Sequence, residues 1–436
     1  MIKMNVGIIG GSDGLGKTLV YYFRDDFNIY ISGRDHKKGK SVADELEVNY
    51  IESNAGLANI SDILIVSVPI EHTSEVIREV APFMKSGSVM IDVTSIKEEP
   101  LKTMAEVLPD TVEYIPSHPV FGPRTTVLDN QIIVLTPDKK GEWYPKVYNY
   151  LKRKNMQIIE TTAEKHDYMM SIVQVLTHFS FISTASAIEK LKVDISETED
   201  YESPIYNLMI DMIARIVSQN PYLTYNIQAR NNNGPKIRNT FTEAAAELRD
   251  VINNNDEDRF VEIAINATKN MGDITNALGR SDKAIGALNY EFIYLNQNIG
   301  QEVGVKHIYS GKIHVGILES VDKKTAVLKT GNKTQKLRLA NIRILIPEEL
   351  HRWKIENLKT KTESISCIFP KNVNVEIIRE TVMNIENIIE IHLTDAYNGP
   401  QISDEFISLT FEVTGLAKED IEKVKNLFTG FGGQIR

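Results

Sequence analysis

The sequence predicts an α/β fold in which a doubly wound parallel sheet is followed by an all-helical domain and a smaller C-terminal α+β region. Three observations predict this order. Apolar runs alternate with helix-like stretches from residue 5 to about 160, helical periodicity dominates from 163 to about 300, and strand-like runs return afterwards. A chain of 436 residues is too long for one hydrophobic core, so several domains are expected.

The first predicted domain, residues 1–162, contains six short apolar runs. Each is expected to be a buried parallel strand, because its apolar side chains are continuous instead of alternating with polar ones. The runs are 5–10, 28–33, 62–69, 87–93, 112–117 and 131–137. With helices between them, they form a doubly wound sheet.

The turn after the first strand is rich in glycine and leads into an apolar helix. Glycine lets the backbone approach a pyrophosphate, whose charge is favoured at a helix N-terminus. When Gly11 and Gly16 are set on the outer glycines of G-x-G-x-x-G, Asp13 takes the middle position. The context predicts a Rossmann-type dinucleotide site. The residues expected at the cofactor are Gly10, Gly11, Ser12, Gly14, Leu15, Gly16, Ser32, Arg34, Ser67, Val68 and Pro69.

The end of the second strand indicates which dinucleotide is used. It reads Ser32-Gly33-Arg34, where an acidic residue would bind the ribose 2′-hydroxyl of NAD. Arg34, with the lysines at 37, 38 and 40, favours a 2′-phosphate, so NADP is predicted over NAD. Asp35 leaves NAD open.

The second predicted domain, residues 163–300, is helical. The stretch 163–191 is long and apolar, as expected for a central helix, and a serine-proline helix start at Ser203 and Pro204 opens another helix that ends before Pro221. A largely buried helical domain after a nucleotide-binding fold predicts a homodimer interface.

The C-terminal part divides into residues 301–361 and 362–436. The first is strand-rich around a Gly331-Asn332 turn and contains 13 Lys and Arg residues against 6 Asp and Glu residues. We interpret it as a small β domain with a solvated basic surface. A surface that binds RNA or an acidic partner is the alternative. The second has the βαββαβ order of a ferredoxin-like domain. A ligand-sensing or docking role is open for it.

The totals indicate a soluble enzyme. The formal net charge of −10 argues against a nucleic-acid coat, and the single Cys367 forms no internal disulfide. The N-terminus lacks a signal-peptide layout, and no apolar run is expected to reach the ~18 residues that span a bilayer. We therefore expect a cytoplasmic protein without a membrane segment, and we assign no metal site.

The stretch PSHPVFGPR, residues 116–124, places His118 between two prolines. Proline fixes the backbone φ angle, so this segment is expected to aim the imidazole at a ligand. A neutral imidazole suits a general base near neutral pH. The alternative is a loop histidine exposed to water.

Motifs in the sequence resemble those of two dehydrogenase families. Gly10-x-x-x-Gly14-x-Gly16, Asn54-Ala-Gly and Tyr148-x-x-x-Lys152 mimic the short-chain dehydrogenases, but Asn54-Ala-Gly precedes the expected strand instead of ending it, and that family lacks a long helical domain. DILIVSVP, IDVTSIK, SHPVFGP, HDYMMSIVQVLTHF and ARIVSQNP, in this order, resemble the prephenate dehydrogenase family over residues 5–300.

The resemblance implies roles for five residues. His118 in HP-x-x-G matches the catalytic histidine, and Ser95 matches a serine between that histidine, the substrate hydroxyl and nicotinamide; an N-cap role for Ser95 is the alternative. Arg215 matches the arginine that binds a substrate carboxylate, with a structural ion pair as the alternative. His178 and Gln174, four apart on one helix face, match substrate-binding positions, and His178 could instead be a core histidine.

Three further residues are expected to have smaller roles. Lys97 is interpreted as first-turn surface, His166 as a residue that caps or crosslinks its helix, and Arg124 as added positive potential below Arg215 in importance.

The implied function is NAD(P)-dependent oxidative decarboxylation of prephenate to 4-hydroxyphenylpyruvate in tyrosine biosynthesis. Arogenate dehydrogenase and a non-catalytic nucleotide-sensing regulator are the alternatives. Related enzymes carry a βαββαβ domain that binds an aromatic amino acid, so such an amino acid is a possible effector of this protein. The FPKNVN loop here lacks the glycine that is usual at such sites. The 388–436 region looks more like an anticodon-binding domain.

Overall fold

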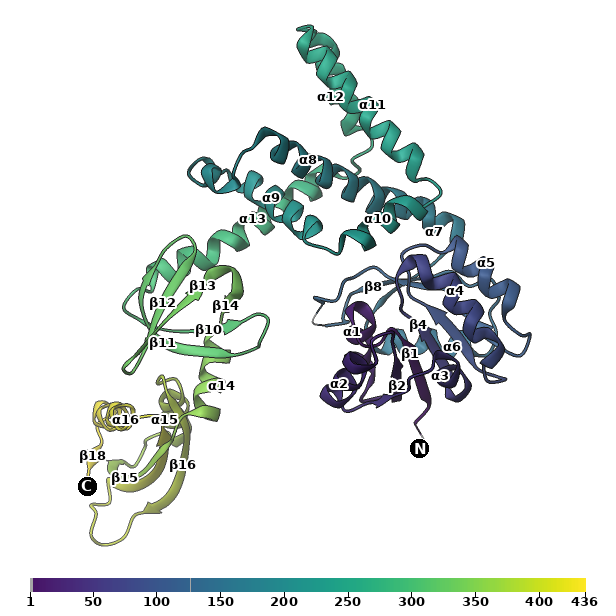
Figure 1. Cartoon of the computed structure of the whole chain (residues 1–436). Helices are drawn as coiled ribbons and strands as arrows, with labels where there is room; N and C mark the ends of the chain where they lie inside the picture. The colour runs from purple at the N-terminus through teal and green to yellow at the C-terminus, as the bar shows by residue number, and fades with distance from the viewer. Residues whose placement is uncertain (1–2, 126) are drawn as a thin grey trace. The chain divides into compact units, whose positions relative to one another are not determined.

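The computed structural model describes residues 3–125 and 127–436 (Figure 1). The chain forms two compact units, Met1–Ile274 and Thr275–Arg436, which are described separately. The finer division into four domains stays a prediction.

The first unit contains a parallel sheet with the order β3-β2-β1-β4-β5-β6 (Figure 1). Its strands are β1 (Asn5–Ile9), β2 (Asn28–Ser32), β3 (Asn49–Tyr50), β4 (Ile63–Val66), β5 (Val89–Asp92) and β6 (Glu113–Tyr114). The helices between and around them are α1 (Gly14–Phe23), α2 (His36–Leu46), α3 (Asn54–Ile60), α4 (Ile70–Val80), the short η1 (Ala81–Phe83), α5 (Glu98–Val107) and α6 (Trp143–Arg153). The predicted doubly wound fold is confirmed.

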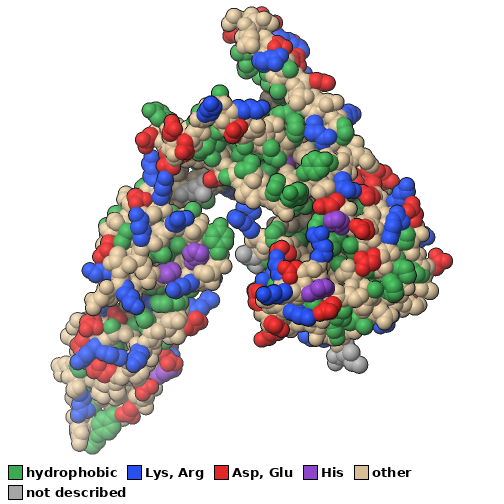
Figure 2. Space-filling view, viewed as in Figure 1, with side chains coloured by type: hydrophobic (Ala, Val, Ile, Leu, Met, Phe, Trp, Pro, Cys, Tyr) green, Lys and Arg blue, Asp and Glu red, His purple; other side chains and the backbone are tan. Residues whose placement is uncertain are grey.

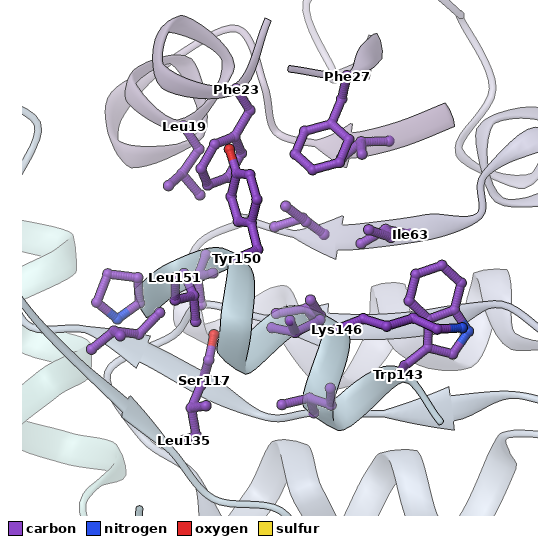
Figure 3. Close-up of a pocket in the computed structure, with 18 of the residues that line it drawn as sticks. Leu19, Phe23, Phe27, Ile63, Ser117, Leu135, Trp143, Lys146, Tyr150 and Leu151 are labelled. Atoms are coloured by element: carbon purple, nitrogen blue, oxygen red, sulfur yellow. The ribbon is translucent and has the colours of Figure 1, made fainter. Parts of the chain in front are cut away.

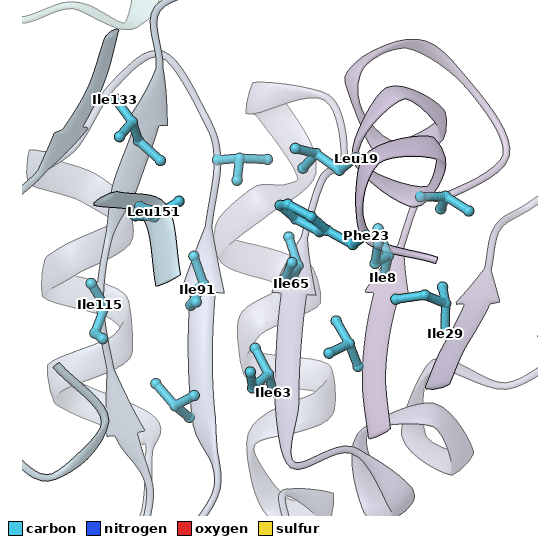
Figure 4. Packing of buried hydrophobic residues seen from close by; sticks show 14 of the residues in the cluster. Ile8, Leu19, Phe23, Ile29, Ile63, Ile65, Ile91, Ile115, Ile133 and Leu151 are labelled. Carbon is cyan, nitrogen blue, oxygen red and sulfur yellow. The ribbon is translucent and has the colours of Figure 1, made fainter. Parts of the chain in front are cut away.

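Both faces of this sheet are apolar, which explains the continuous apolar runs. On one face, Ile8, Ile65 and Ile91 lie beside Leu19 and Phe23 of α1 (Figure 4). The other face packs against α3, α4 and α5 in a separate cluster. Because every strand is parallel, the loops after β1, β4 and β5 meet at one edge, which is where the candidate site is built.

The run 131–137 was expected in the parallel sheet, and this expectation is wrong. The strand β8 (Ile132–Leu135) pairs antiparallel with β7 (Ser117–Pro119) and parallel with β9 (Gln157–Glu160), in a separate three-stranded sheet. An apolar run does not say which partner a strand takes. His118 therefore lies in a short strand and not in a free loop.

Helices follow this sheet in the first unit. They are α7 (Ala163–Met170), the π-helical η2 (Ser171–Leu176), α8 (Thr177–Leu191), the 3₁₀ segment η3 (Ile195–Tyr201), α9 (Pro204–Val217), α10 (Pro221–Arg230), α11 (Gly234–Asn253) and α12 (Glu257–Thr268). The hydroxyl of Ser203 accepts a hydrogen bond from the Tyr206 N–H and caps α9, which ends before Pro221, as predicted. Pro221 opens α10.

One helix exceeds the sequence expectation for apolar length. The continuous helix Ala163–Leu191 is long and apolar enough to cross a membrane by length and composition alone, with a mean hydropathy of 1.3 over its best window. Only 17% of that window is buried in the chain. A helix of a protein without a membrane segment can have the same length and composition, so the expectation of no membrane segment stays a prediction. This helix carries the polar residues of the candidate site.

The second unit begins with α13 (Ile274–Gln297) and contains two antiparallel sheets. The first has the order β13-β12-β11-β10-β14, and the second β16-β17-β15-β18. The strands are β10 (Glu302–His307), β11 (Ile313–Val321), β12 (Thr325–Thr330), β13 (Lys333–Arg338), β14 (Ile342–Ile344), β15 (Lys361–Pro370), β16 (Ile388–Tyr397), β17 (Phe406–Gly415) and β18 (Gln434–Ile435). The helical segments are η4 (Leu339–Asn341), α14 (Pro347–Asn357), α15 (Val375–Met383) and α16 (Lys418–Gly430).

The β15-α15-β16-β17-α16-β18 order confirms the ferredoxin-like prediction. Gly331, at a φ of 58°, forms the predicted turn between β12 and β13. The sequence reading missed α14, whose Lys354 side chain is 7% exposed and pairs with Glu302 at the start of β10.

Candidate active site

The turn between β1 and α1 brings two loops into close backbone contact. Gly10 has a φ of +81°, and a Cβ placed on it would lie 2.1 Å from the carbonyl oxygen of Ser67. A Cβ on Gly16 would lie 2.2 Å from the carbonyl oxygen of Gly10. Only glycine permits both approaches, and the result is an open backbone surface at the N-terminus of α1, which fits a dinucleotide pyrophosphate.

Asp13 occupies the position where the fingerprint has its middle glycine. Its carboxylate accepts a hydrogen bond of 2.8 Å from the Gly14 N–H, which caps α1, and it forms an ion pair with Lys38. The hydrogen bond from Lys38 lowers the pKa of Asp13 below its ordinary value. Because the Asp13 side chain is 80% exposed, it can turn outward, and it does not close the surface.

The charged residues that follow β2 differ in whether they have a hydrogen bond or an ion pair within the protein. The carboxylate of Asp35 accepts from the Lys38 N–H and caps α2, and Lys40 pairs with Glu52. Arg34 is exposed and forms no ion pair within the described residues. Lys37 is also exposed and forms no ion pair among these residues, so two cations remain at the end of β2. Ser32 is buried and bonds Asn54 at 2.8 Å, which supports the turn from inside.

A buried ion pair stands at the end of β5. Asp92 and Lys97 are both 0% exposed, and the Lys97 ammonium also donates to the Ser117 carbonyl at 2.6 Å. Burial lowers the pKa of Lys97, and the Asp92 carboxylate opposes that shift. The interpretation of Lys97 as first-turn surface is wrong, because the turn before α5 folds inward under β7.

The N-terminus of α5 is capped by a residue from a distant segment. The Asp167 carboxylate accepts from the backbone N–H groups of Lys97 at 2.8 Å and Glu98 at 3.0 Å. The alternative N-cap role for Ser95 is therefore wrong. Ser95 is half-buried, and its hydroxyl has no hydrogen bond among the described residues.

His118 is the centre of a buried hydrogen-bonded chain. It is 3% exposed, so the alternative of a water-exposed loop histidine is wrong. Its Nδ1 lies 2.9 Å from Nε2 of His166, and Nδ1 of His166 lies 2.7 Å from Oδ1 of Asp167. His166 thus crosslinks its helix to β7.

Asp167 fixes the direction of this chain. A carboxylate that accepts from two backbone N–H groups has no proton of its own to donate, so Nδ1 of His166 donates to it. When His166 carries one proton, on Nδ1, its Nε2 accepts and His118 donates from Nδ1. In that arrangement the lone pair of His118 lies on Nε2.

The environment keeps this lone pair available. Desolvation lowers the pKa of His118 well below its ordinary value, and the neighbouring Lys97 cation lowers it further. His118 therefore stays neutral through the neutral pH range and can take up a proton from a ligand.

Gln174 reaches the free nitrogen of His118. Its Nε2 lies 3.5 Å from Nε2 of His118, and its Oε1 is buried without a partner among the described residues. It lies in η2, whose π-helical turn departs from the regular spacing of the flanking helices. His178 is 9% exposed, and its Nδ1 also lacks a partner in the described chain. Gln174 and His178 therefore each have a polar atom that can form a hydrogen bond with a ligand.

Arg215 lies near the end of α9 on an exposed face. It has no ion pair within the ranges that the structure describes, so the structural ion-pair alternative is wrong. The structure does not join Arg215 or Ser95 to the histidine chain by a hydrogen bond. Arg124 is exposed in the loop after β7.

Asp92 and Asp167 were missed by the sequence reading. Asp167 stands beside His166 in the HD pair, and Asp92 opens the DVTSIK segment. Acidic residues at a strand end and next to a histidine were the available signal. Within residues 3–125 and 127–436 there is no group of three or more His, Cys, Asp or Glu side chains that could hold a metal ion.

The chain is similar to known proteins in sequence and in fold. The chain matches the family model of the prephenate dehydrogenase nucleotide-binding domain over residues 22–160 and that of the prephenate dehydrogenase dimerization domain over residues 162–265. A probable arogenate/prephenate dehydrogenase of Methanocaldococcus jannaschii is 39% identical over 98% of this chain and 96% of its own length. The T-protein of Haemophilus influenzae is 29% identical over 58% of this chain and 64% of its own.

Among solved structures, prephenate dehydrogenase of A. aeolicus, in complex with hydroxyphenyl propionate and NAD⁺, matches with a TM-score of 0.51 and 18% identity. The match covers 63% of this chain and 99% of that one. At this identity the likeness concerns the fold.

Proposed function

The chain belongs to the prephenate dehydrogenase family, and from that premise we propose that prephenate is its substrate and NADP the cofactor it uses better. The protein is a prephenate or arogenate dehydrogenase, an NAD(P)-dependent oxidoreductase of tyrosine biosynthesis. The observation that carries the proposal is the buried Asp167–His166–His118 chain, which binds Nδ1 of His118 and leaves its Nε2 as the proposed proton acceptor.

The reaction needs a base at the substrate hydroxyl. Hydride leaves C4 of prephenate as the 4-hydroxyl becomes a carbonyl, and loss of CO₂ then makes the ring aromatic. Without a proton acceptor, positive charge would build up on C4. His118 Nε2 accepts the hydroxyl proton, and it returns the proton to the same oxygen when the electrons of the broken C–CO₂ bond reach it.

The buried hydrogen-bonded chain can stabilise His118 both as a neutral base and after His118 has taken up a proton. When Nε2 takes a proton, His118 becomes a cation that donates from Nδ1 to His166, and His166 donates to the Asp167 carboxylate. The carboxylate stabilises this cation across one imidazole. Gln174 and the half-buried Ser95 hydroxyl are proposed to hold the substrate hydroxyl beside Nε2.

The cofactor would be held by the backbone of the glycine turn and by Ser67, Val68 and Pro69 after β4. Nicotinamide supplies the hydride acceptor when it is bound. Arg34, without an ion pair among the described residues, is proposed to bind the 2′-phosphate of NADP, because Asp35 already uses its carboxylate to cap α2. This arrangement supports NADP over NAD.

The substrate carries two carboxylates, and a guanidinium fork is the best bidentate partner for one of them. Arg215 is proposed for this role, since it has no partner of its own within the described residues, and His178 offers a polar Nδ1 in addition. Arogenate differs from prephenate by an amino group on the side chain.

A homodimer through the helices is proposed as the assembly. The matched family model is named a dimerization domain. Apolar side chains stay exposed on α8 and α9, for example Ile182 at 37% and Met209 and Met212 at 40% (Figure 2). A groove of about 890 Å³ among α8, α9, α10 and α11 is lined by Phe179, Ile216 and Tyr225. These surfaces are apolar enough to need a partner.

The deciding experiment is an absorbance assay at 340 nm of the full chain with both substrates and both cofactors, with and without tyrosine. We expect the highest kcat/KM with prephenate and NADP. Turnover of arogenate alone, or a clear preference for NAD, would overturn the corresponding half of the proposal. Inhibition by tyrosine would support the proposed aromatic amino acid effector.

The alternative of a non-catalytic nucleotide sensor does not agree with the family to which the chain belongs. A sensor needs the glycine turn but has no use for a buried histidine chain, so the chain also counts against it.

A further inference from the structure

The face of the parallel sheet that packs against α1 and α6 is not completely filled. A cavity of about 410 Å³ lies there, lined by Leu19, Phe23, Phe27, Ile63, Trp143 and Tyr150 among others (Figure 3). It opens beside Lys146 and Arg153, away from the histidine chain. Pockets for small ligands commonly have volumes of about 300–1000 Å³.

Three side chains from the middle of the sheet face the cavity and keep part of their surface exposed, Ile63 at 7%, Ile65 at 5% and Ile91 at 9%. Their neighbours Leu64 and Met90, which point to the other face, are 0% exposed. Protein interiors are normally close-packed, so a cavity of this size departs from ordinary core packing and leaves room for a ligand.

The walls and the mouth of the cavity have different chemistry. Phe23, Phe27 and Tyr150 form an aromatic wall, with ring centroids 5.7 Å apart for Phe23–Tyr150 and 5.0 Å for Phe27–Tyr150. Lys146 lies 4.8 Å above the Trp143 ring and Arg153 lies 5.7 Å from the Tyr150 ring, both exposed at the mouth. An aromatic wall accepts a further ring in edge-to-face packing.

The two cations have no carboxylate partner in the part of the chain that the structure describes. Lys146 and Arg153 are seven apart on α6 and so lie on one side of it. The nearby Asp26 is already bound, by the Lys154 ammonium at 2.6 Å and the Tyr150 hydroxyl at 2.7 Å. The mouth is therefore positive, and it favours a carboxylate and disfavours an ammonium.

We propose that this cavity binds an aryl-alkyl carboxylate, with its ring among Phe23, Phe27 and Tyr150 and its carboxylate at Lys146 and Arg153. The site is separate from the proposed substrate site. Ser117 and Pro119 of β7 line the cavity, while His118 between them points to His166. A bound ligand would thus lie against the back of the strand that carries the base.

The experiment uses 4-phenylbutyrate as the probe and Trp143 as the reporter. The chain has two tryptophans, so Trp353→Phe leaves Trp143 as the only one. We expect 4-phenylbutyrate to change its emission saturably, 4-phenylbutan-1-ol to bind more weakly, and 4-phenylbutylamine to bind least. No saturable change with millimolar 4-phenylbutyrate would refute the proposal. Because binding is read without turnover, failure of the proposed function would not affect this result.

Variants in the same background locate the probe. Val147→Phe fills the cavity from α6 and should abolish the change, whereas Val76→Phe, on α4 at the opposite sheet face, should leave it intact. Lys146→Gln with Arg153→Gln, both on the surface, should weaken the carboxylate on the order of tenfold and leave the alcohol unchanged. A signal that survives Val147→Phe and disappears with saturating prephenate would place the probe in the substrate site and overturn the proposal.

Discussion

The glycine turn and the histidine chain lie at the same edge of the parallel sheet but are built in opposite ways. The turn is made of backbone, from the loop after β1 and the loop after β4, with exposed side chains such as Asp13 and Lys38 around it. The chain is made of buried side chains from segments far apart, since His118 and His166 are 48 positions apart and Lys97 and Asp167 are 70 apart. Nucleotide binding needs an open surface, whereas a base with a lowered pKa needs burial.

This difference predicts where substitutions have their largest effects. Side chains at the turn can move or exchange partners with water, so their loss is partly compensated. A buried group in the chain has no such alternative, and its loss leaves a partner without a hydrogen bond. The following predictions test that contrast from the largest effect to the smallest.

Replacement of the base should have the largest effect. His118→Asn is expected to lower kcat by about 10²–10⁴-fold, because no other group at Nε2 can accept the proton, with a modest change in substrate binding. Steady-state kinetics with saturating cofactor measure it. An unchanged kcat would remove His118 from the mechanism.

Loss of the buried cation should destabilise the fold itself. Lys97→Met leaves Asp92 as an uncompensated buried charge and releases the Ser117 carbonyl, so the free energy of unfolding should fall by about 3–5 kcal/mol. Urea denaturation followed by circular dichroism measures the loss. Lys17→Met, which breaks the exposed pair with Glu45, is the matched control and should show a far smaller change. Equal losses in both variants would contradict the contrast.

Arg215→Ala should act on substrate binding. Loss of a charge-assisted hydrogen bond to a carboxylate is expected to raise KM by about 10–1000-fold, or about 1.5–4 kcal/mol, with kcat less affected. Initial-rate kinetics separate the two constants. Because Arg215 is exposed and has no ion pair among the described residues, the variant should unfold at the wild-type temperature. A fall in melting temperature without a change in KM would speak against substrate binding.

Asp167→Asn tests the direction of the hydrogen-bonded chain. An amide can donate to Nδ1 of His166, which would reverse the protons along the chain and place a hydrogen on Nε2 of His118. We expect kcat to fall on the order of 10–100-fold. Asp167→Glu, which keeps a carboxylate, should recover part of the loss. Equal kcat values for wild type and Asp167→Asn would show that the chain does not set the tautomer.

The pH profile should show the smallest change. The pKa of His118 is lowered, so the neutral base persists below pH 6.5, and kcat/KM should decline only when the pH falls through the folded pKa. His166→Gln removes the imidazole that links His118 to the Asp167 carboxylate, so the protonated form of His118 loses that stabilisation, and the decline should move to still lower pH. The unfolded chain binds this proton below about pH 6.5, so stability from this group also falls there. A pH profile unchanged by His166→Gln would contradict the role of His166.

The sequence by itself determined the glycine turn, the parallel strands and His118 as the site histidine. These features are local: the positive φ of Gly10 and the continuous apolar strands leave marks within a few residues. Only the tertiary structure decided that Asp167, and not Ser95, caps α5, that Lys97 is buried against Asp92, and that the 131–137 run joins the strand of His118. It also decided that the core beside α6 is left open. Pairing and burial between distant segments depend on how side chains pack in three dimensions, and residue order alone does not carry that information.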